Sequence, residues 1–305
     1  MIARRLVAGA LIAGGLFAVL WSAGRRDERP GAEGSRGFPE HVVPGPDAPV
    51  SFRHGGALLA AALIGAGLVT ALLWTLADRA GLGAPTVEPK LTIEITGKEW
   101  WWQVRYLSEE PSRVFETANE IHVPVGEPVR LKLISDNVIH SFWVPAIAGK
   151  TDLIPGQTNL TVLEATKEGV YRGQCAEFCG LQHANMALML VAVSKDDFAA
   201  WWDKQLEPAP APGAPALAEG LSNFVVKCGA CHSVRGTVAG GRLGPNLSHL
   251  MGRRTLAAGT LPNTPGHLAG WIADPQGIKR GSKMPRLDLT PAELTTIRTY
   301  LQTLK

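Results

Sequence analysis

Two long apolar runs at the start of the chain predict membrane-spanning helices. Residues 6–21 are flanked by arginine pairs, and residues 55–76 contain no charged side chain. The second run has the ~20-residue length that spans a bilayer, and Trp74 near its end suits the membrane interface. The first run is shorter and could instead be the core of a signal peptide. We expect a first, marginal helix within residues 1–24 and a second within residues 55–80.

The basic residues between the two runs favour a helical hairpin. The linker, residues 25–54, carries five arginines, whereas two precede the first run. Because cytoplasmic loops are enriched in Lys and Arg, this bias puts the linker in the cytoplasm and the chain after residue 80 outside. A cleaved signal peptide would leave the linker outside instead.

Apolar and polar positions alternate from Leu91 onward and predict a β domain. The alternation runs through Ile93 and Ile95 and continues in the aromatic run at 100–106. Further strand-like runs, separated by Gly, Pro and Asn, lie at 121–125, 129–135, 160–164, 169–173 and 189–193. Several short strands with turns between them predict a sandwich or barrel over residues 86–206, with a short helix at 196–206.

A proline-rich spacer, residues 207–216, separates this domain from one with helical periodicity. Residues 217–305 begin with apolar positions at helical spacing and end in a helix that a capping box, Thr290-Pro-Ala-Glu293, opens. So small a helical domain has few apolar residues for a core, and a covalently bound group would complete it.

Charge is divided unevenly between the two predicted domains. Residues 86–206 carry 11 basic and 16 acidic side chains, a net charge of −5, whereas residues 217–305 carry 11 and 4, a net charge of +7. Opposite charges could steer one domain onto the other or onto separate partners. Two solvated surfaces are the simpler alternative. We expect no nucleic-acid partner.

Two of the four cysteines lie in a motif with copper-binding chemistry. Cys175, Cys179, His183 and Met186 supply two thiolates, an imidazole and a thioether within twelve residues, a soft set that suits copper. A structural zinc site or a disulfide would use the same cysteines. Met186 is a poor zinc ligand, however, and His140 lies in an apolar run where a solvated histidine would be out of place. These residues favour copper, held in the loop between the last two strands.

The other two cysteines form a haem-attachment motif. Cys228-Gly-Ala-Cys231-His232 supplies two thiols for the haem vinyl groups and a histidine for the iron. A redox dithiol or half of a zinc site is the alternative, but this motif follows a helical segment rather than a strand. Because such attachment takes place outside the cytoplasm, both soluble domains should lie there.

The sixth haem ligand should lie downstream of the motif. Met284 in Gly281-Ser-Lys-Met-Pro is similar to the methionine loop of class I cytochromes c, and Met251 is its competitor. The turn at Gly244-Pro245 resembles the one whose proline carbonyl orients the histidine ring in that class. Methionine ligation would raise the haem potential. Around Met284 lie four basic residues, which form either a solvated face or a docking surface: Lys279, Arg280, Lys283 and Arg286.

Four segments of the chain look like subunit II of the cytochrome c oxidases. They are GKEWWW at 97–102, VIHSFWVP at 138–145, GKTDLIPG at 149–156 and QCAEFCGLQHANM at 174–186. The fused haem domain makes the chain similar to the caa-type members, whose subunit II carries its own cytochrome c. The resemblance implies a membrane α-helical hairpin, an all-β cupredoxin-like domain and an all-α class I cytochrome c domain.

The resemblance also implies a binuclear mixed-valence copper centre, CuA. Cys175 and Cys179 would bridge the two coppers, while His140 and His183 would each bind one. Met186 would be the weak ligand of one copper and the Glu177 carbonyl that of the other. The Glu177 side chain would bind magnesium at the contact with subunit I, although it could be an ordinary loop carboxylate.

Trp100 would be the port for electrons from cytochrome c, as the first tryptophan of the run is in the family. The three tryptophans could equally be packing residues, and alternation turns Trp101 away from its neighbours. Lys98-Glu99 stands where many relatives have His-Gln, which puts details of the port in doubt.

These features predict the electron-accepting subunit of a terminal oxidase. Electrons would pass from an external cytochrome c or other donor to haem c, then to CuA, then to a haem of subunit I, where oxygen is reduced to water. Subunit I, subunit III and the bacterial plasma membrane would be its partners, with both soluble domains on the periplasmic side of a multi-pass chain.

Three alternatives share some of these features. A quinol oxidase subunit should lack the copper ligands. A nitric-oxide- or nitrous-oxide-reducing system could also use a CuA domain, although the hairpin and the fused haem domain favour the oxidase. A free membrane-anchored electron carrier is the third.

Overall fold

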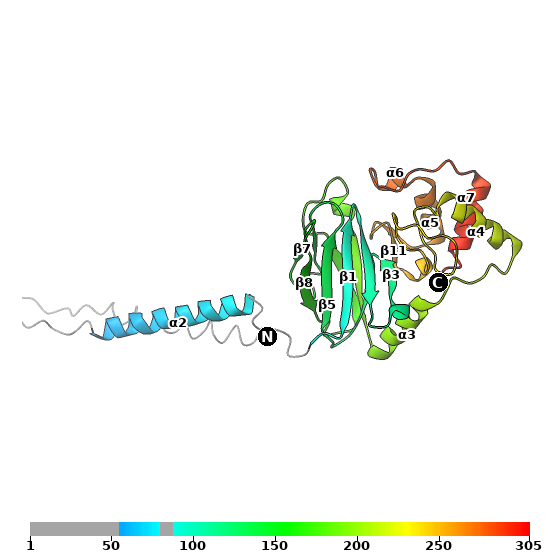
Figure 1. Cartoon of the computed structure of the whole chain (residues 1–305). Helices are drawn as coiled ribbons and strands as arrows, with labels where there is room; N and C mark the ends of the chain where they lie inside the picture. Colours follow the sequence, from blue (N-terminus) through cyan, green and yellow to red (C-terminus); the bar gives the residue numbers. More distant parts are fainter. Residues whose placement is uncertain (1–54, 80–87) are drawn as a thin grey trace, which may run out of the picture. The chain divides into compact units, whose positions relative to one another are not determined.

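The computed structural model describes residues 55–79 and 88–305 (Figure 1). The chain forms two units, residues 1–84 and 85–305. Helix α2, Gly55–Arg79, is the described part of the first unit, and its segment Leu59–Ala77 is long and apolar enough to cross a membrane. The predicted first helix in 1–24 and the linker 25–54 lie outside the described residues.

The β domain, residues 88–206, is built on a five-stranded sheet in the order β3-β2-β1-β5-β8. Strand β1 pairs antiparallel with β2 and parallel with β5. Its inward positions Ile93 and Ile95 are fully buried because alternate side chains of a strand face the same side. The strands are β1 Leu91–Lys98, β2 Trp101–Leu107, β3 Phe115–Ala118, β5 Val129–Ser135 and β8 Asn159–Leu163.

A second, three-stranded sheet in the order β4-β10-β9 completes the core of the β domain. It comprises β4 Glu120–Pro124, β9 Gly169–Gln174 and β10 Ala187–Val193. A short hairpin of β6 His140–Phe142 and β7 Thr151–Leu153 stands beside them, and helix α3 Lys195–Leu206 follows β10. The 3-10 turns of the domain are η1 Pro111–Arg113 and η2 His183–Asn185.

The helical domain, residues 215–305, packs around the antiparallel pair of its first and last helices. Gly220 lets them approach closely, because a Cβ there would lie 2.3 Å from the Thr296 carbonyl oxygen. The capping box predicted at Thr290 and Glu293 is confirmed. The helices are α4 Pro215–Lys227, α5 Pro265–Ala273, α6 Pro275–Ile278 and α7 Pro291–Leu301, with a 3-10 turn η3 Leu250–Gly252. A ribbon of β11 Thr255–Leu256 and β12 Leu261–Pro262 is a small addition to the expected all-helical fold.

The spacer before α4 lies against the helical domain. The Ala209 N–H donates to the Arg235 carbonyl at 2.9 Å, and a Cβ on Gly236 would lie 2.6 Å from Pro208 Cβ. These contacts hold the start of the spacer on the surface of the domain that it introduces.

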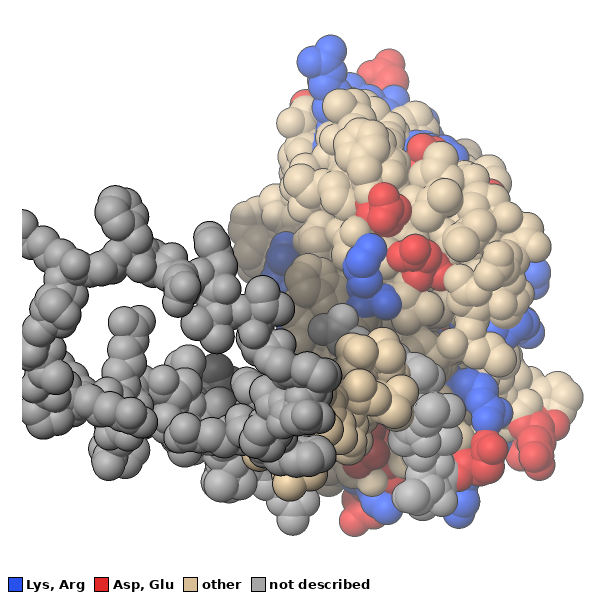
Figure 2. All heavy atoms as spheres, turned by 90° about the vertical axis from the view of Figure 1, so that its left-hand side faces the viewer, with Lys and Arg blue, Asp and Glu red and all other residues tan. Residues whose placement is uncertain are grey.

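Charged side chains of both signs are interspersed on the face shown in Figure 2, where uncharged residues cover most of the area. Some of the charges of the β domain are paired: Lys132 of β5 with Glu94 of β1 at 2.8 Å, and Arg130 of β5 with Glu88, before β1, at 2.6 Å.

Candidate functional site

The predicted copper ligands meet at one end of the β domain. The cysteine loop, residues 175–186, joins β9 to β10 and contains the turn η2. The Cys175 and Cys179 sulfurs lie 3.7 Å apart, and the ligand atoms of His140, Cys175 and Cys179 all lie within 4.8 Å of one another. All three residues are buried. This is the chemistry and spacing that a small copper centre needs.

His140 reaches the cluster from a different part of the chain. It opens β6, and its Nδ1 lies 3.9 Å from the Cys175 sulfur. Its Nε2 lies 3.0 Å from Asn137 Oδ1, which only accepts hydrogen bonds. Nε2 therefore carries the ring proton, and Nδ1 keeps a lone pair for a metal. A Cβ on Gly97 would lie 2.7 Å from the ring, so glycine is needed beside it.

His183 and Met186 close the other side of the cysteine pair. His183 Nδ1 lies 3.5 Å and Met186 Sδ 3.8 Å from the Cys179 sulfur. Met186 is fully buried, as a weak ligand excluded from water should be. Two thiols, two imidazoles and a thioether therefore converge, and this soft donor set fits copper better than a hard cation.

The two groups of Glu177 point to different surroundings. Its carbonyl oxygen lies 3.2 Å from the Cys175 sulfur, beside the cluster. Its carboxylate pairs with Lys150 at 3.7 Å and is partly exposed. The carbonyl is thus placed to reach a metal, whereas the carboxylate faces outward, where a second protein could share it.

The cysteine pair is set up to lose its protons in turn. The hydrogen bond shared with Cys179 lowers the pKa of Cys175, while the pKa of Cys179 is raised by the same contact and by burial. The first proton therefore leaves the pair more easily than the second, and binding of copper by the two thiolates would release whatever protons remain.

The haem motif follows the end of helix α4, as the sequence predicts. His232 Nδ1 lies 2.8 Å from the Pro245 carbonyl, which orients the ring and leaves Nε2 for iron. Burial lowers the pKa of His232, so the imidazole is neutral and able to bind. A Cβ on Gly244 would lie 2.5 Å from the same ring. With Cys228 and Cys231 both free, these residues fit a covalently held haem.

The two candidate sixth ligands differ in their surroundings. Met284 lies on the methionine loop, residues 279–286, where its carbonyl accepts from Gln276 Nε2 at 2.7 Å. Met251 lies in η3, packs against the core of the helical domain, and donates its N–H to Leu304 at 2.8 Å. Met251 is thus used in packing, which favours Met284 as the ligand; the assignment stays a prediction.

Trp100 lies between the cysteine loop and the methionine loop. Its indole N–H donates to the Cys179 carbonyl at 2.8 Å. On its other side a Cβ on Gly281, in the methionine loop, would lie 4.0 Å from the ring. Trp100 is only 9% exposed, so it does not present an open face to solvent as an electron port reached from outside would.

Two residues that contribute here, Asn137 and Glu120, were not singled out from the sequence, and the role of a third, Lys279, was not predicted. Asn137, which orients His140, had no signal beyond its place three residues earlier. Glu120 and Lys279 are buried between the two domains, and Lys279 had been grouped with surface charges. Their burial depends on how the domains pack, which local sequence does not encode.

Comparison with known proteins identifies both domains. The profile of the cytochrome c oxidase subunit II periplasmic domain matches residues 103–193, and that of cytochrome c matches residues 217–305. The subunit 2 of cytochrome c oxidase from Alkalihalophilus pseudofirmus is 38% identical over 215 residues, 70% of this chain and 61% of that one. Residues 103–193 therefore belong to the cytochrome c oxidase subunit II family, and residues 217–305 belong to the cytochrome c family.

Two further similar proteins each match part of this chain. Subunit 2 from Bacillus sp. PS3 is 33% identical over 227 residues, 70% of this chain and 62% of that one. This chain thus matches less than two thirds of the length of either of these relatives. The periplasmic domain of subunit II from Bradyrhizobium japonicum aligns with 39% of the chain and 95% of its own length, at 34% identity and a TM-score of 0.37.

Proposed function

We propose that this subunit II accepts electrons for a terminal cytochrome c oxidase, passing them from its own haem c to a binuclear copper centre and on to a haem of subunit I. The observation that carries the proposal is the position of Trp100. One side of this residue is bonded to the cysteine loop and the other is packed against the methionine loop. The cysteine loop and the loop that carries the candidate haem ligand Met284 therefore contact the same buried side chain.

The residues of the chain perform the remaining tasks. When bound, the copper and haem supply one-electron chemistry. Asn137 and the Pro245 carbonyl fix the two imidazole rings, so that little rearrangement is needed when the charge of either site changes. Burial of Cys175 and Cys179 keeps water from their sulfur atoms. Cys175 and Cys179 would hold the copper centre as thiolates, and the centre would accept and pass on single electrons.

Several partners belong to this proposal. Helix α2 would anchor the chain in the plasma membrane, with the soluble domains on the periplasmic side. Subunits I and III would lie beside it, and an external cytochrome c would deliver electrons. The outward Glu177 carboxylate would exchange Lys150 for a magnesium ion at the contact with subunit I.

Metal analysis and EPR of the full chain, purified in detergent with the proteins that accompany it, test this function. We expect two coppers per chain with a delocalised mixed-valence signal, a low-spin haem c, and a large haem-containing subunit in the same complex. Zinc, or a single copper with a localised signal, would contradict the copper centre. Purification of the chain alone would support a free carrier, and reduction of nitric oxide in place of oxygen would support a different haem–copper enzyme.

A further inference from the structure

Lys279 of the methionine loop is buried in the β domain. The residue is 2% exposed, although lysine is rarely found so deep in a protein. Its Nζ donates to the carbonyl oxygens of Trp100 and Asn185, each at 2.7 Å, and to that of Ala257 at 2.9 Å. Two of these acceptors belong to the β domain and the third to the helical domain. A single amino group thus joins backbone segments of both domains.

This arrangement is costly unless every hydrogen bond is made. Removing an amino group from water is unfavourable, and burial lowers the pKa of Lys279 to about 7. The three carbonyls offset part of that cost, because they match the three donors that the amino group has when it is protonated. Removing the lysine would leave three carbonyls without this donor, which is more costly than losing an exposed ion pair.

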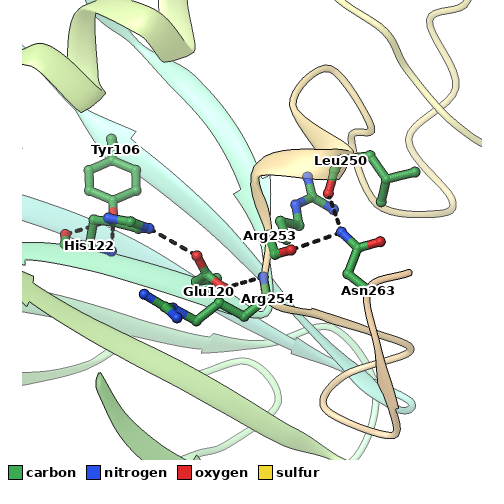
Figure 3. A network of polar contacts seen from close by, with 7 residues as sticks. All are labelled: Tyr106, Glu120, His122, Leu250, Arg253, Arg254 and Asn263. Atoms are coloured by element: carbon green, nitrogen blue, oxygen red, sulfur yellow. Dashed lines mark hydrogen bonds and ion pairs between the residues drawn. The ribbon is translucent and has the colours of Figure 1, made fainter. Parts of the chain in front are cut away.

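A second buried polar residue crosses the same interface in the opposite direction. Glu120 of β4 is 6% exposed, and its Oε2 accepts the Arg254 N–H of the helical domain at 2.9 Å (Figure 3). Its Oε1 lies 3.0 Å from His122 Nε2. His122 in turn is held by the Tyr106 hydroxyl and stacks on Trp201. The carboxylate is therefore fixed from the β domain side before the helical domain meets it.

Further hydrogen bonds between the domains lie close to the cysteine loop. The Ala187 N–H, next to Met186, donates to the Ala258 carbonyl at 2.9 Å. Gln182 Nε2, within the cysteine loop, donates to the Arg280 carbonyl at 2.7 Å. A Cβ on Gly259 would lie 2.7 Å from Ala187 Cβ, so a glycine is needed for these two segments to approach so closely.

We propose that Lys279 is a positioning residue that holds the methionine loop on Trp100, so that the two domains form a fixed pair and a soluble donor must deliver its electron to the haem. The last part rests on the proposed function. The alternative is a mobile domain on a tether that docks transiently through surface charges. Among the described residues, the methionine loop forms an ion pair with the β domain through Lys283 and Glu99 at 3.5 Å; its lysine is exposed, so the pair contributes little.

Hydrogen exchange of the full chain in detergent tests the fixed pairing without relying on electron transfer. The Ala187 and Arg254 amides each donate across the interface, so their protection reports on docking. In Lys279→Met, which keeps the length but no donor, we expect their protection to fall about thirtyfold, while amides of β1 and β5 keep theirs. The matched control Lys283→Met removes an exposed pair from the same loop and should change protection less than about fivefold.

Two results would overturn the proposal. One is equal protection of the Ala187 and Arg254 amides in Lys279→Met and the parent protein. The other is exchange of these amides in the parent protein at the rate of an exposed loop. Should Lys279→Met prove unstable, Glu120→Gln can be measured instead. This change weakens the hydrogen bond that Glu120 accepts from the Arg254 amide, and it must lower the protection of the Ala187 and Arg254 amides. Loss of copper or haem from the parent protein would count against the proposed function but leave the exchange result intact.

The rate of electron transfer in the complete oxidase is a second measurement. This rate would not change if Lys279 had only a structural role. A soluble photoreductant gives one electron to the haem iron, which passes it to the copper centre and returns to its oxidised form. With the domains fixed, the rate should not depend on ionic strength; in Lys279→Met it should fall about tenfold and become salt-dependent, because docking then relies on surface charges. A parent rate that varies with salt as steeply as that of the variant would contradict a fixed pair.

Discussion

Gly97 shows how closely single residues are fitted around the predicted copper site. A Cβ at this position would lie 2.7 Å from the His140 ring. We expect Gly97→Ala to displace the ring, lower copper affinity about 10- to 100-fold, and cost about 1–3 kcal/mol of stability. Copper titration followed by the visible spectrum measures the affinity. Gly149→Ala, where a Cβ would have nothing within 4 Å, is the control and should bind copper normally.

Met186 tests a different property of the same site, the strength of a weak ligand. Leucine has nearly the volume of methionine, so Met186→Leu should change the free energy of unfolding by less than about 1.5 kcal/mol. It should keep both coppers, shift the potential of the centre and slow electron transfer. Copper content and a redox titration check this expectation. Complete loss of copper would mean that Met186 is a principal ligand rather than a weak one.

At the scale of elements, the methionine loop carries the candidate sixth haem ligand, Met284. Met284→Ala should leave the haem attached through Cys228 and Cys231, lower its potential and abolish the methionine–iron absorption band. The visible spectrum and a redox titration of the purified chain are the measurements. Met251→Leu, a change in the packed turn η3, should preserve the band. If Met251→Leu abolished the band and Met284→Ala did not, the ligand would be Met251.

The sequence predicted elements whose pattern is local and missed those that depend on other parts of the chain. Strand β5 begins and ends at the predicted residues, and the cysteine loop lies between β9 and β10 as expected, because alternation and ligand spacing are local signals. The three-residue strands β6 and β7 were missed, since they are too short for a period to show. The position of His140 could be inferred only from the apolar run around it.

Charge patterning gave the least reliable interpretation of a side chain. Lys279, Arg280 and Lys283 follow one another closely in sequence, yet the first is buried and the others are exposed. Composition cannot separate them because burial of Lys279 needs carbonyl groups from residues 100 and 185, far away in the chain. The resemblance to subunit II supplied the cofactors; it could not supply the contacts between the two domains.

At the scale of the whole molecule, the pairing of the domains should depend on pH. A free lysine has a pKa of 10.5, and burial lowers that of Lys279 to about 7, so docking releases a proton between these values. Protection of the Ala187 and Arg254 amides, corrected for intrinsic exchange, should therefore rise by up to about tenfold per unit from pH 7 to pH 9. Below pH 7 it should be constant. The same profile in Lys279→Met, which cannot titrate there, should be flat.

The contact of the spacer with the helical domain affects the kinetic order of electron transfer between the two sites. Because Ala209 bonds to Arg235 and Pro208 packs on Gly236, little of the spacer is free to let the domains separate. Transfer between the two sites would then be first order, unchanged when the enzyme is diluted or embedded sparsely in a membrane. Only the step that loads the haem would follow the concentration of a carrier, so saturation with that carrier would expose the internal rate directly.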